Sequence, residues 1–327
     1  MHKKVVFLGM GGTIAGKASR PGDNVGYKAA QLSVTDLLDA VPGLQVALGS
    51  HTAVAEQVAQ LDSKDMDHAS WHTLANRVAH HLGQPDVAGV VITHGTDTLE
   101  ETAYFLSCVL AADLLLAKPV VLTCAMRPAT SRSPDGPQNM VDAVATACST
   151  GARGVLVVCG GEVHDGRHVQ KVHPYRVTAF DSGEAGPLGF VEEGVVRMVH
   201  HWPQVSAKLT NLATLPATTH WPRVEVLLSH AGATGALVRG LLAGPEHDAQ
   251  PVRGIVVAGT GNGTMHSAMV DVLQLARSRG VTVVRCSRCA YGEIVESSSP
   301  DPADFPAMKL SPVKARIALM LDLMSKT

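Results

Sequence analysis

The stretch "VVFLGMGGTIAG", residues 5–16, combines an apolar run with a glycine-rich turn and a single hydroxyl group, that of Thr13. The apolar run is typical of a strand buried on both faces, as in the centre of a parallel sheet. Gly9, Gly11 and Gly12 follow it and allow positive φ angles and close backbone approach. Because open α/β sheets bind ligands beyond the carboxyl ends of their strands, this turn is a candidate site. A purely structural glycine turn is the alternative.

Further apolar, β-branched runs alternate with helical patterns along the chain. Strands are expected at residues 5–9, 87–94, 119–125, 154–159, 224–229, 254–258 and 281–285. The clearest helices are expected at residues 64–82, 99–110, 138–148, 265–279 and 313–324. This alternation predicts an α/β fold with parallel sheets.

The length of the chain favours two domains, because 327 residues exceed a single ordinary core. Glycines and prolines interrupt the regular pattern over residues 183–222. We expect a larger N-terminal domain over residues 1–205, with a mostly parallel sheet flanked by helices. A linker over 206–222 then leads to a smaller C-terminal α/β domain with a parallel sheet over 223–327.

The composition argues against several classes of protein. The formal net charge is −2 and no basic stripe is present, which disfavours nucleic-acid binding. No apolar run approaches the roughly 20 residues of a membrane span. The N-terminus lacks a signal-peptide pattern, which predicts a cytoplasmic protein. The pairs His68/His72 and Cys286/Cys289 have metal-like spacing, but no further ligands are evident, so surface and packing roles are expected.

The second informative stretch, "VVITHGTDTLEET" at residues 90–102, repeats the arrangement of a buried strand that ends in a polar turn. Its plain interpretation is a helix start, with Thr96 or Asp97 as the N-cap and acidic residues in the first turn. That interpretation accounts for one polar residue and leaves Thr93 and His94 unexplained. The turn is therefore a second candidate site, although His94 alone is more typical of a structural hydrogen-bonding residue.

Two further motifs follow the next predicted strands, "AMRPATS" at residues 125–131 and "DGRHVQK" at residues 165–171. With "GGTI" near the N-terminus, "HGTDT", and "GTGNG" at residues 259–263, they stand in an order that resembles the bacterial-type L-asparaginases, including the glutaminase-asparaginases. The resemblance extends from Val5 to the final predicted helix. Each motif is loose by itself, so the weight lies in their shared order and spacing.

The resemblance implies catalytic roles for several polar residues. Thr13 matches the nucleophile, and Tyr27 matches a mobile-loop tyrosine that activates it. Thr96 matches a second threonine, and Asp97 matches the carboxylate that holds the substrate α-amino group. Lys171 matches the lysine paired with that second threonine. Such a set suits amide hydrolysis, which needs a nucleophile, a proton acceptor and donors for the oxyanion.

Substrate-binding roles are implied for a second group of residues. Ser63 matches the residue that binds the α-carboxylate, and Asn262 matches one lent by a neighbouring subunit. Lys64 departs from the pattern, because many relatives carry Gln or Glu there. Its charge would favour a second substrate carboxylate, unless the side chain points outward. Relatives also place a glutamate beyond the last predicted strand, where Glu293 is favoured over Glu296.

The function implied by the resemblance is hydrolysis of L-asparagine to L-aspartate and ammonia through a threonine-linked β-aspartyl intermediate. No metal or organic cofactor is implied, and the expected assembly is a homotetramer built from close dimers. One alternative is a glutaminase-asparaginase with broader amide specificity, since a single methylene separates the two substrates. Another is a non-catalytic amino-acid-binding relative. A nucleotide-binding oxidoreductase is more distant, because G-x-G-G-T differs from the dinucleotide fingerprint.

Overall fold

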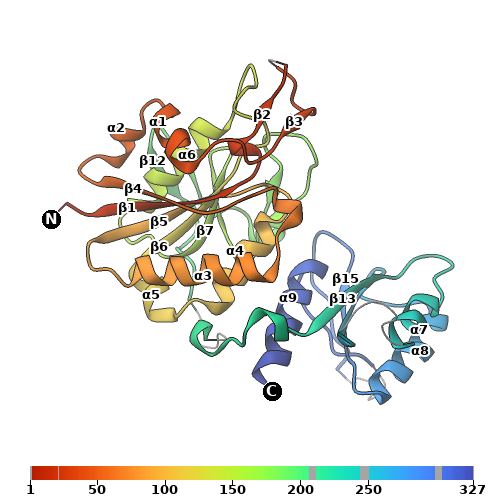
Figure 1. The fold of residues 1–327 in the computed structure, drawn as a ribbon. Helices are drawn as coiled ribbons and strands as arrows, with labels where there is room; N and C mark the ends of the chain where they lie inside the picture. The colour runs from red at the N-terminus through yellow and green to blue at the C-terminus, as the bar shows by residue number, and fades with distance from the viewer. Residues whose placement is uncertain (1, 21, 206–210, 244–249, 299–303, 327) are drawn as a thin grey trace. The chain divides into compact units, whose positions relative to one another are not determined.

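The computed structural model describes residues 2–20, 22–205, 211–243, 250–298 and 304–326. The chain divides into two compact units, Met1–Ala213 and Thr214–Thr327 (Figure 1). The division lies inside the expected linker 206–222, of which residues 206–210 lie outside the described residues. Within the described part, every helix is too short or too polar to cross a membrane.

The first unit is built on an eight-stranded sheet with the order β12-β11-β8-β7-β6-β5-β1-β4 (Figure 1). Neighbouring strands from β4 to β7 pair in parallel, whereas β8, β11 and β12 extend the sheet through antiparallel pairing. The strands of this sheet are β1 (Lys4–Gly11), β4 (Thr52–Leu61), β5 (Val87–Thr93), β6 (Pro119–Thr123), β7 (Gly154–Cys159), β8 (Glu162–Asp165), β11 (Gly189–Glu192) and β12 (Val195–Met198).

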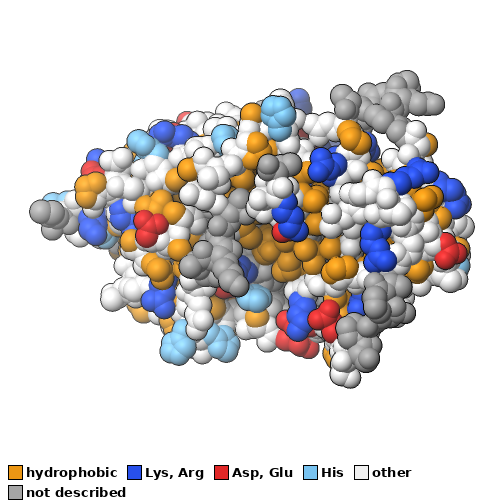
Figure 2. All heavy atoms as spheres, turned by 90° about the horizontal axis from the view of Figure 1, so that it is seen from below, with side chains coloured by type: hydrophobic (Ala, Val, Ile, Leu, Met, Phe, Trp, Pro, Cys, Tyr) orange, Lys and Arg blue, Asp and Glu red, His pale blue; other side chains and the backbone are white. Residues whose placement is uncertain are grey.

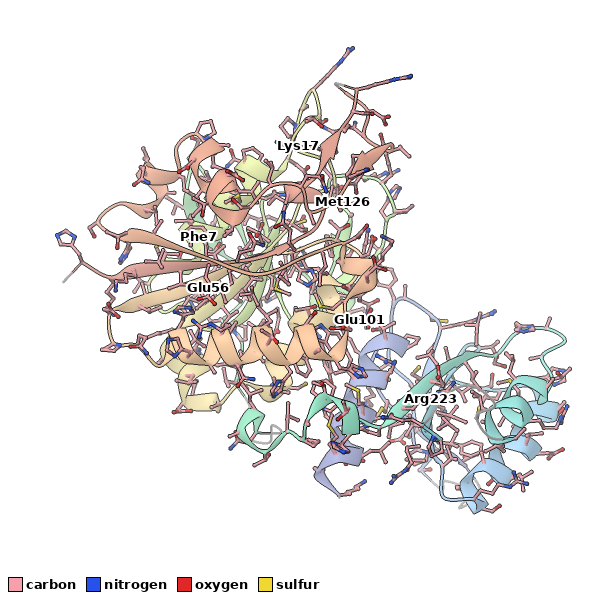
Figure 3. All side chains as sticks on the ribbon, in the orientation of Figure 1. Phe7, Lys17, Glu56, Glu101, Met126 and Arg223 are labelled. Carbon is pink, nitrogen blue, oxygen red and sulfur yellow. The ribbon has the colours of Figure 1, made fainter. Side chains whose placement is uncertain are left out.

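Helices cover both faces of this sheet, as Figure 1 shows. One face carries α1 (Val34–Ala40), α2 (Leu44–Leu48) and α6 (Gly136–Ala147), and the other carries α3 (His68–Leu82), α4 (Leu99–Val109) and α5 (Ala112–Ala117). Val5 and Phe7, the latter labelled in Figure 3, pack into the core beneath α1, α2 and α6. Val6 and Leu8 alternate to the opposite face and are also fully buried. The apolar run of β1 is thus explained by burial on both faces.

Short elements connect these layers and carry several polar residues. The short strands are β2 (Lys17–Ala18), β3 (Tyr27–Lys28), β9 (Gln170–Lys171) and β10 (Phe180–Asp181). The single-turn 3₁₀ helices are η1 (Thr13–Ala15), η2 (Ser63–Asp65), η3 (Gly183–Ala185), η4 (Leu212–Thr214) and η5 (Thr218–His220). β2 pairs with β3, and β9 pairs with β10, as two small antiparallel sheets.

The second unit contains a three-stranded parallel sheet with the order β13-β14-β15. Its elements are β13 (Arg223–Leu228), α7 (Ala236–Leu242), β14 (Val252–Gly259), α8 (Ser267–Ser278), β15 (Thr282–Ser287) and α9 (Pro312–Ser325). Helix α9 packs on β13 and β14, while α8 packs on α7 and β15. The predicted fold class is confirmed: a larger, mostly parallel α/β domain is followed by a smaller parallel one.

The structure also differs from the sequence prediction in instructive places. The helix predicted over residues 64–82 is divided into η2 and α3, because Asp67 accepts a hydrogen bond from the Ser70 N–H and starts a new helix. Strand β4 was not predicted, since its side chains are half-buried or exposed and form no continuous apolar run. Its Glu56, labelled in Figure 3, binds Arg77 and His81 of α3 instead, and Arg77 holds the pKa of Glu56 down at about 2.

The carboxyl ends of β1 and β5 form the point where the chain connections diverge. β1 leads through α1 and α2 to β4 on one side, whereas β5 leads through α4 and α5 to β6 on the other. Gly12 follows β1 with a φ of 80°, and a Cβ atom on it would overlap the backbone of Gly95, which follows β5. Two glycines therefore let these loops touch, at the kind of position where open α/β sheets bind ligands.

A buried hydrogen-bond chain fixes the loop that contains Gly95. The Trp71 indole N–H donates to the Thr102 hydroxyl (2.9 Å), which lies 3.0 Å from His94 Nε2. His94 Nδ1 lies 2.7 Å from the Gly95 carbonyl oxygen, and a carbonyl oxygen only accepts, so Nδ1 carries the proton. Each polar atom of this chain has a partner, which identifies His94 as a neutral structural residue. Burial lowers the pKa of His94 to about 4.

We predict that Gly12→Ala destabilises the protein more than Gly43→Ala does. Gly43, at φ 77° and ψ −2°, is left-handed helical, where alanine costs about 1–2 kcal/mol, whereas Gly12, at φ 80° and ψ −170°, lies in a region that is essentially restricted to glycine. Only Gly12 adds an overlap with neighbouring backbone, which typically costs a further ~1–3 kcal/mol. Denaturant unfolding followed by circular dichroism measures both losses. Equal losses would contradict the close contact with Gly95.

We also predict acid destabilisation through His94. The unfolded chain binds a proton at the ordinary pKa of 6.5, whereas the folded chain resists protonation down to about 4. The contribution of His94 to the free energy of unfolding is therefore fully present above pH 6.5. It is lost as the pH falls toward 4, by up to ~1.4 kcal/mol per pH unit. Unfolding free energies between pH 7.5 and 4.5 should fall less steeply for His94→Gln than for the parent chain. Parallel curves would contradict this role.

Candidate functional site

Thr13 and Tyr27 form a hydroxyl pair beyond the end of β1. Thr13 begins η1 and is 7% exposed, and its Oγ1 atom lies 2.6 Å from the Tyr27 phenol oxygen. Tyr27 begins β3, which returns along β2 to bring the ring back over the turn. Gly16 leaves room for this ring, since a Cβ atom there would lie 2.8 Å from the ring carbon Cδ2. The predicted nucleophile thus has a proton-exchanging partner in direct contact.

Thr96, Asp97 and Lys171 form a second polar cluster beyond the end of β5. The Lys171 ammonium donates to Thr96 Oγ1 at 2.9 Å and to Asp97 Oδ1 at 2.6 Å. The Lys171 side chain is 16% exposed, whereas that of Asp97 is 52% exposed. One end of the ion pair is therefore enclosed, and the carboxylate end remains open to an incoming cationic group.

Ser63 connects this cluster to a third loop. Its hydroxyl accepts a hydrogen bond from the Asp97 N–H at 3.2 Å, and its carbonyl accepts one from the Thr98 hydroxyl at 2.7 Å. A Cβ atom on Gly95 would overlap the Ser63 side chain. Ser63 thus packs against Gly95, which in turn packs against Gly12. The structure brings together the loops after β1, β4 and β5, with Lys171 reaching in from β9.

The N-cap interpretation of Thr96 and Asp97 is wrong. Helix α4 begins at Leu99 with Thr98 as its N-cap, and the Thr98 side chain makes no capping hydrogen bond. Thr96 and Asp97 precede this cap, so their side chains are directed to Lys171 instead. The first turn is served by the acidic residues Glu100 and Glu101, which suit the positive end of the helix dipole.

Lys64 lies beside Ser63 but is directed away from the cluster. Its ammonium pairs with Asp62 at 2.7 Å and Asp65 at 3.3 Å, and its side chain is 61% exposed. Both carboxylates raise the pKa of Lys64. The outward orientation that the sequence left open is the one observed, because two acidic neighbours on η2 hold the charge at the surface.

Asn262 and Glu293 lie in the second unit, in the loops that follow β14 and β15. The Asn262 side-chain amide donates to the Val295 carbonyl and accepts from the Val295 N–H, both at 2.8 Å. It thereby anchors the segment that contains Glu293. The Glu293 carboxylate lies 3.0 Å from the Lys309 ammonium, and its side chain is 62% exposed.

Asp135 supports the loop that follows β6, and this loop touches the turn after Thr13, because the Ala129 N–H donates to the Gly16 carbonyl at 3.1 Å. Its carboxylate accepts hydrogen bonds from the Met126 N–H at 2.9 Å and the Arg127 N–H at 3.0 Å. It also lies 3.4 Å from the Asn139 side-chain amide. These bonds fix the loop that follows β6. The usable signal was an aspartate directly before Gly-Pro at a helix start, which is typical of a residue that binds nearby backbone N–H groups.

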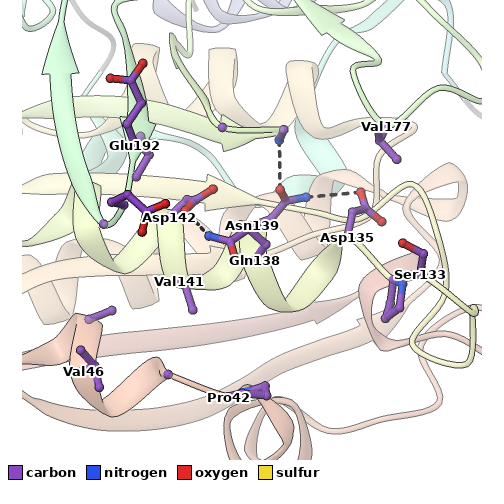
Figure 4. Close-up of a pocket in the computed structure, with 18 of the residues that line it drawn as sticks. Pro42, Val46, Ser133, Asp135, Gln138, Asn139, Val141, Asp142, Val177 and Glu192 are labelled. Carbon is purple, nitrogen blue, oxygen red and sulfur yellow. Dashed lines mark hydrogen bonds between the residues drawn. The ribbon is translucent and has the colours of Figure 1, made fainter.

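A separate hollow of about 1150 Å³ lies between α2, α6 and the β11–β12 turn (Figure 4). Its described lining residues include neither Thr13 nor any member of the Lys171 cluster. Within it, the Gln138 amide donates to Asp142 at 2.8 Å, and Glu192 pairs with Arg197 at 2.7 Å. Each of these contacts lies within one wall, whereas the Gly160 N–H donates to Asn139 Oδ1 at 3.0 Å and joins α6 to the turn after β7.

Basic, acidic and histidine side chains are all present on the face shown in Figure 2. The formal net charge of the whole chain is −2. Among the described residues, no group of three or more His, Cys, Asp or Glu side chains is arranged to hold a metal ion. Cys286 is buried and Cys289 is exposed, and both are free thiols.

Comparison with known proteins identifies both units. The family described as Asparaginase, N-terminal matches residues 4–204, and the Glutaminase/Asparaginase C-terminal domain matches residues 223–327. The glutaminase-asparaginase of Pseudomonas fluorescens biotype A is 37% identical over 98% of this chain and 86% of its own length. L-asparaginase 2 of Escherichia coli (strain K12) is 36% identical over 98% of this chain and 88% of its own.

The same relationship holds in three dimensions. The crystal structure of a probable cytoplasmic L-asparaginase from Campylobacter jejuni superposes with a TM-score of 0.88 and 36% sequence identity. The match covers 99% of this chain and 96% of that one. These similarities confirm the family resemblance on which the motifs converge, and the chain belongs to the asparaginase family of amidohydrolases.

Proposed function

We propose that this protein is an L-asparaginase, which hydrolyses the side-chain amide of L-asparagine to L-aspartate and ammonia with Thr13 as the nucleophile. One observation carries the proposal: the Thr13–Tyr27 pair and the Thr96–Asp97–Lys171 cluster follow the ends of two adjacent strands. A hydroxyl nucleophile with a proton partner and a lysine–threonine pair suit two-step acyl transfer.

The reaction proceeds by formation and cleavage of an ester. Thr13 Oγ1 bonds to the amide carbon, and its proton passes through the hydrogen-bonded Tyr27 to the amide nitrogen, while the Lys171 ammonium bonded to Thr96 stabilises the developing negative charge. Collapse of the tetrahedral intermediate then releases ammonia. Water then attacks the β-aspartyl ester, which releases L-aspartate and restores the Thr13 hydroxyl.

The exposed side of the Thr96–Asp97–Lys171 cluster is proposed to orient the substrate. The half-exposed Asp97 carboxylate suits the α-ammonium group of the substrate. The Ser63 hydroxyl, which accepts from the Asp97 N–H, suits the substrate α-carboxylate. Charge-assisted hydrogen bonds of this kind fix a small zwitterion at both ends. L-glutamine is a second candidate substrate, because the Pseudomonas fluorescens relative is named a glutaminase-asparaginase. A non-catalytic role is disfavoured by the intact nucleophile and lysine cluster.

The proposed assembly is a homotetramer in which Asn262 and Glu293 complete the site of a neighbouring subunit. The exposed Glu293 carboxylate and its anchored segment support this role. The cytoplasm is the proposed compartment, supported by six free cysteines that include the buried Cys124 and Cys159. Sedimentation of the purified protein tests the assembly, and fractionation of the producing cells tests the compartment.

We predict that Thr13→Ala abolishes turnover and leaves the fold intact. Loss of the nucleophile should lower kcat for L-asparagine by at least about 10³-fold, with an unchanged circular dichroism spectrum. Ammonia release measures the rate, and Thr52→Ala on the exposed start of β4 is a matched control expected to keep full activity. Near-full activity of Thr13→Ala would refute the nucleophile assignment.

We predict that Lys64 has little influence on the choice between the two amides. Because Asp62 and Asp65 already neutralise its ammonium, Lys64→Gln should change the ratio of kcat/KM for asparagine and glutamine by less than about threefold, or ~0.7 kcal/mol. Ser63→Ala, measured in parallel, should raise KM for asparagine markedly. A large change of preference in Lys64→Gln would place its charge in the substrate site.

A further inference from the structure

The strand that carries Lys171 is weakly supported by its own pairing. β9 contains only Gln170 and Lys171, and it pairs with β10 through Lys171–Phe180 and Gln170–Asp181. This two-stranded ladder is separate from the eight-stranded sheet. Short isolated hairpins are marginally stable in water, so contacts outside the ladder must hold Lys171 within 2.9 Å of Thr96.

One such contact comes from a buried histidine on the large sheet. His164 lies on β8, where it pairs with Val157 of β7, and it is 1% exposed. Its Nδ1 atom lies 2.9 Å from the hydroxyl of Ser182, the residue that directly follows β10 and is 5% exposed. The His164–Ser182 contact therefore joins the Lys171 hairpin to a rigid strand of the main sheet.

Neighbouring acidic groups determine which ring nitrogen carries the proton. Glu162 lies two residues earlier on the same strand, with its carboxylate 3.4 Å from His164 Nε2. A carboxylate there favours the N–H on Nε2, which leaves Nδ1 to accept from the Ser182 hydroxyl. Asp181 also faces this group, but burial outweighs it and lowers the pKa of His164 to about 4. The ring is therefore neutral, and the contact is intact, throughout the neutral range.

The other end of the hairpin is fixed by bonds around the β8–β9 turn, where the Arg167 N–H donates to Asp165 Oδ1 at 2.9 Å. The N–H groups of His168 and Val169 both donate to the Asp165 carbonyl at 3.0 Å, and the Gly166 N–H donates to the Val155 carbonyl at 2.9 Å. These bonds turn the chain from β8 into β9. The entry into β9 is thus fixed by several local bonds, whereas on the exit side the His164–Ser182 contact is a side-chain bond to the main sheet that mutation can remove.

We propose that His164 is a positioning residue for Lys171, acting through Ser182 to hold the β9–β10 hairpin at the distance that catalysis requires. The proposal rests on the role assigned to Lys171 in the proposed function. His164 touches neither Thr96 nor Asp97; it acts by restricting the hairpin that delivers the ammonium to them. A misplacement of about 1 Å in such a group commonly costs on the order of 100-fold in rate.

The test compares His164→Leu, Ser182→Ala and the double variant in the full-length protein. Each change removes the same hydrogen bond, so each should lower kcat for L-asparagine by about 10- to 100-fold and alter its pH profile. The double variant should lose no more than the larger single loss, because the two changes are not independent. His164→Asn keeps an acceptor within reach of Ser182 and should restore kcat to within about threefold.

Val163→Ala is the matched control, because Val163 is a fully buried neighbour on the same strand. It should lower the melting temperature yet keep the parent kcat and pH profile. If His164→Leu does not fold, Ser182→Ala, which removes a single oxygen atom, supplies the same comparison. Parent-like kcat and pH profile in folded Ser182→Ala and His164→Leu, beside an inactive Lys171→Met, would overturn the positioning role alone. An active Lys171→Met would overturn the proposed function and this inference together.

Discussion

Contact between the backbones at Gly12 and Gly95 is the constraint on which the rest of the site depends. Parallel neighbours β1 and β5 bring their carboxyl ends to one edge, but side chains on the following turns would hold the loops apart. Glycine removes that obstacle on both sides, and Ser63 then packs against Gly95 from a third loop. As a result, Thr13 and Thr96, which directly follow these two glycines, lie near each other at the edge of the sheet.

The polar groups around this contact form two sets, one that is fully buried and one that remains partly exposed. The chain from Trp71 through Thr102 to His94 is closed, with a partner for each donor and acceptor, and it holds the Gly95 carbonyl in place. An unsatisfied group in such a position would cost free energy, so the network has a structural role. Asp97 differs, because half of its side chain remains exposed. Exposure leaves it free to exchange water for a charged substrate group.

Sequence patterns predicted the central elements well and the peripheral ones poorly. Strands buried on both faces, such as β7 at residues 154–159, have a continuous apolar signal that depends on burial alone. Strand β4 lacks that signal because it lies at an edge of the sheet, and β8, β11 and β12 are short antiparallel strands whose pairing arises from chain reversal. The helix start at residue 64 was misplaced, since Asp67 competes as a cap.

The sequence by itself determined the α/β alternation, the two-domain organisation and the types of polar residue that follow β1 and β5. Only the tertiary structure decided which of them meet. Lys171 and Thr96 are 75 positions apart, and their contact depends on a hairpin anchored through Ser182. The structure also decided that Lys64 faces two carboxylates and not the cluster. The physical reason is that local patterns report burial and backbone preference, whereas a site requires the path of the whole chain.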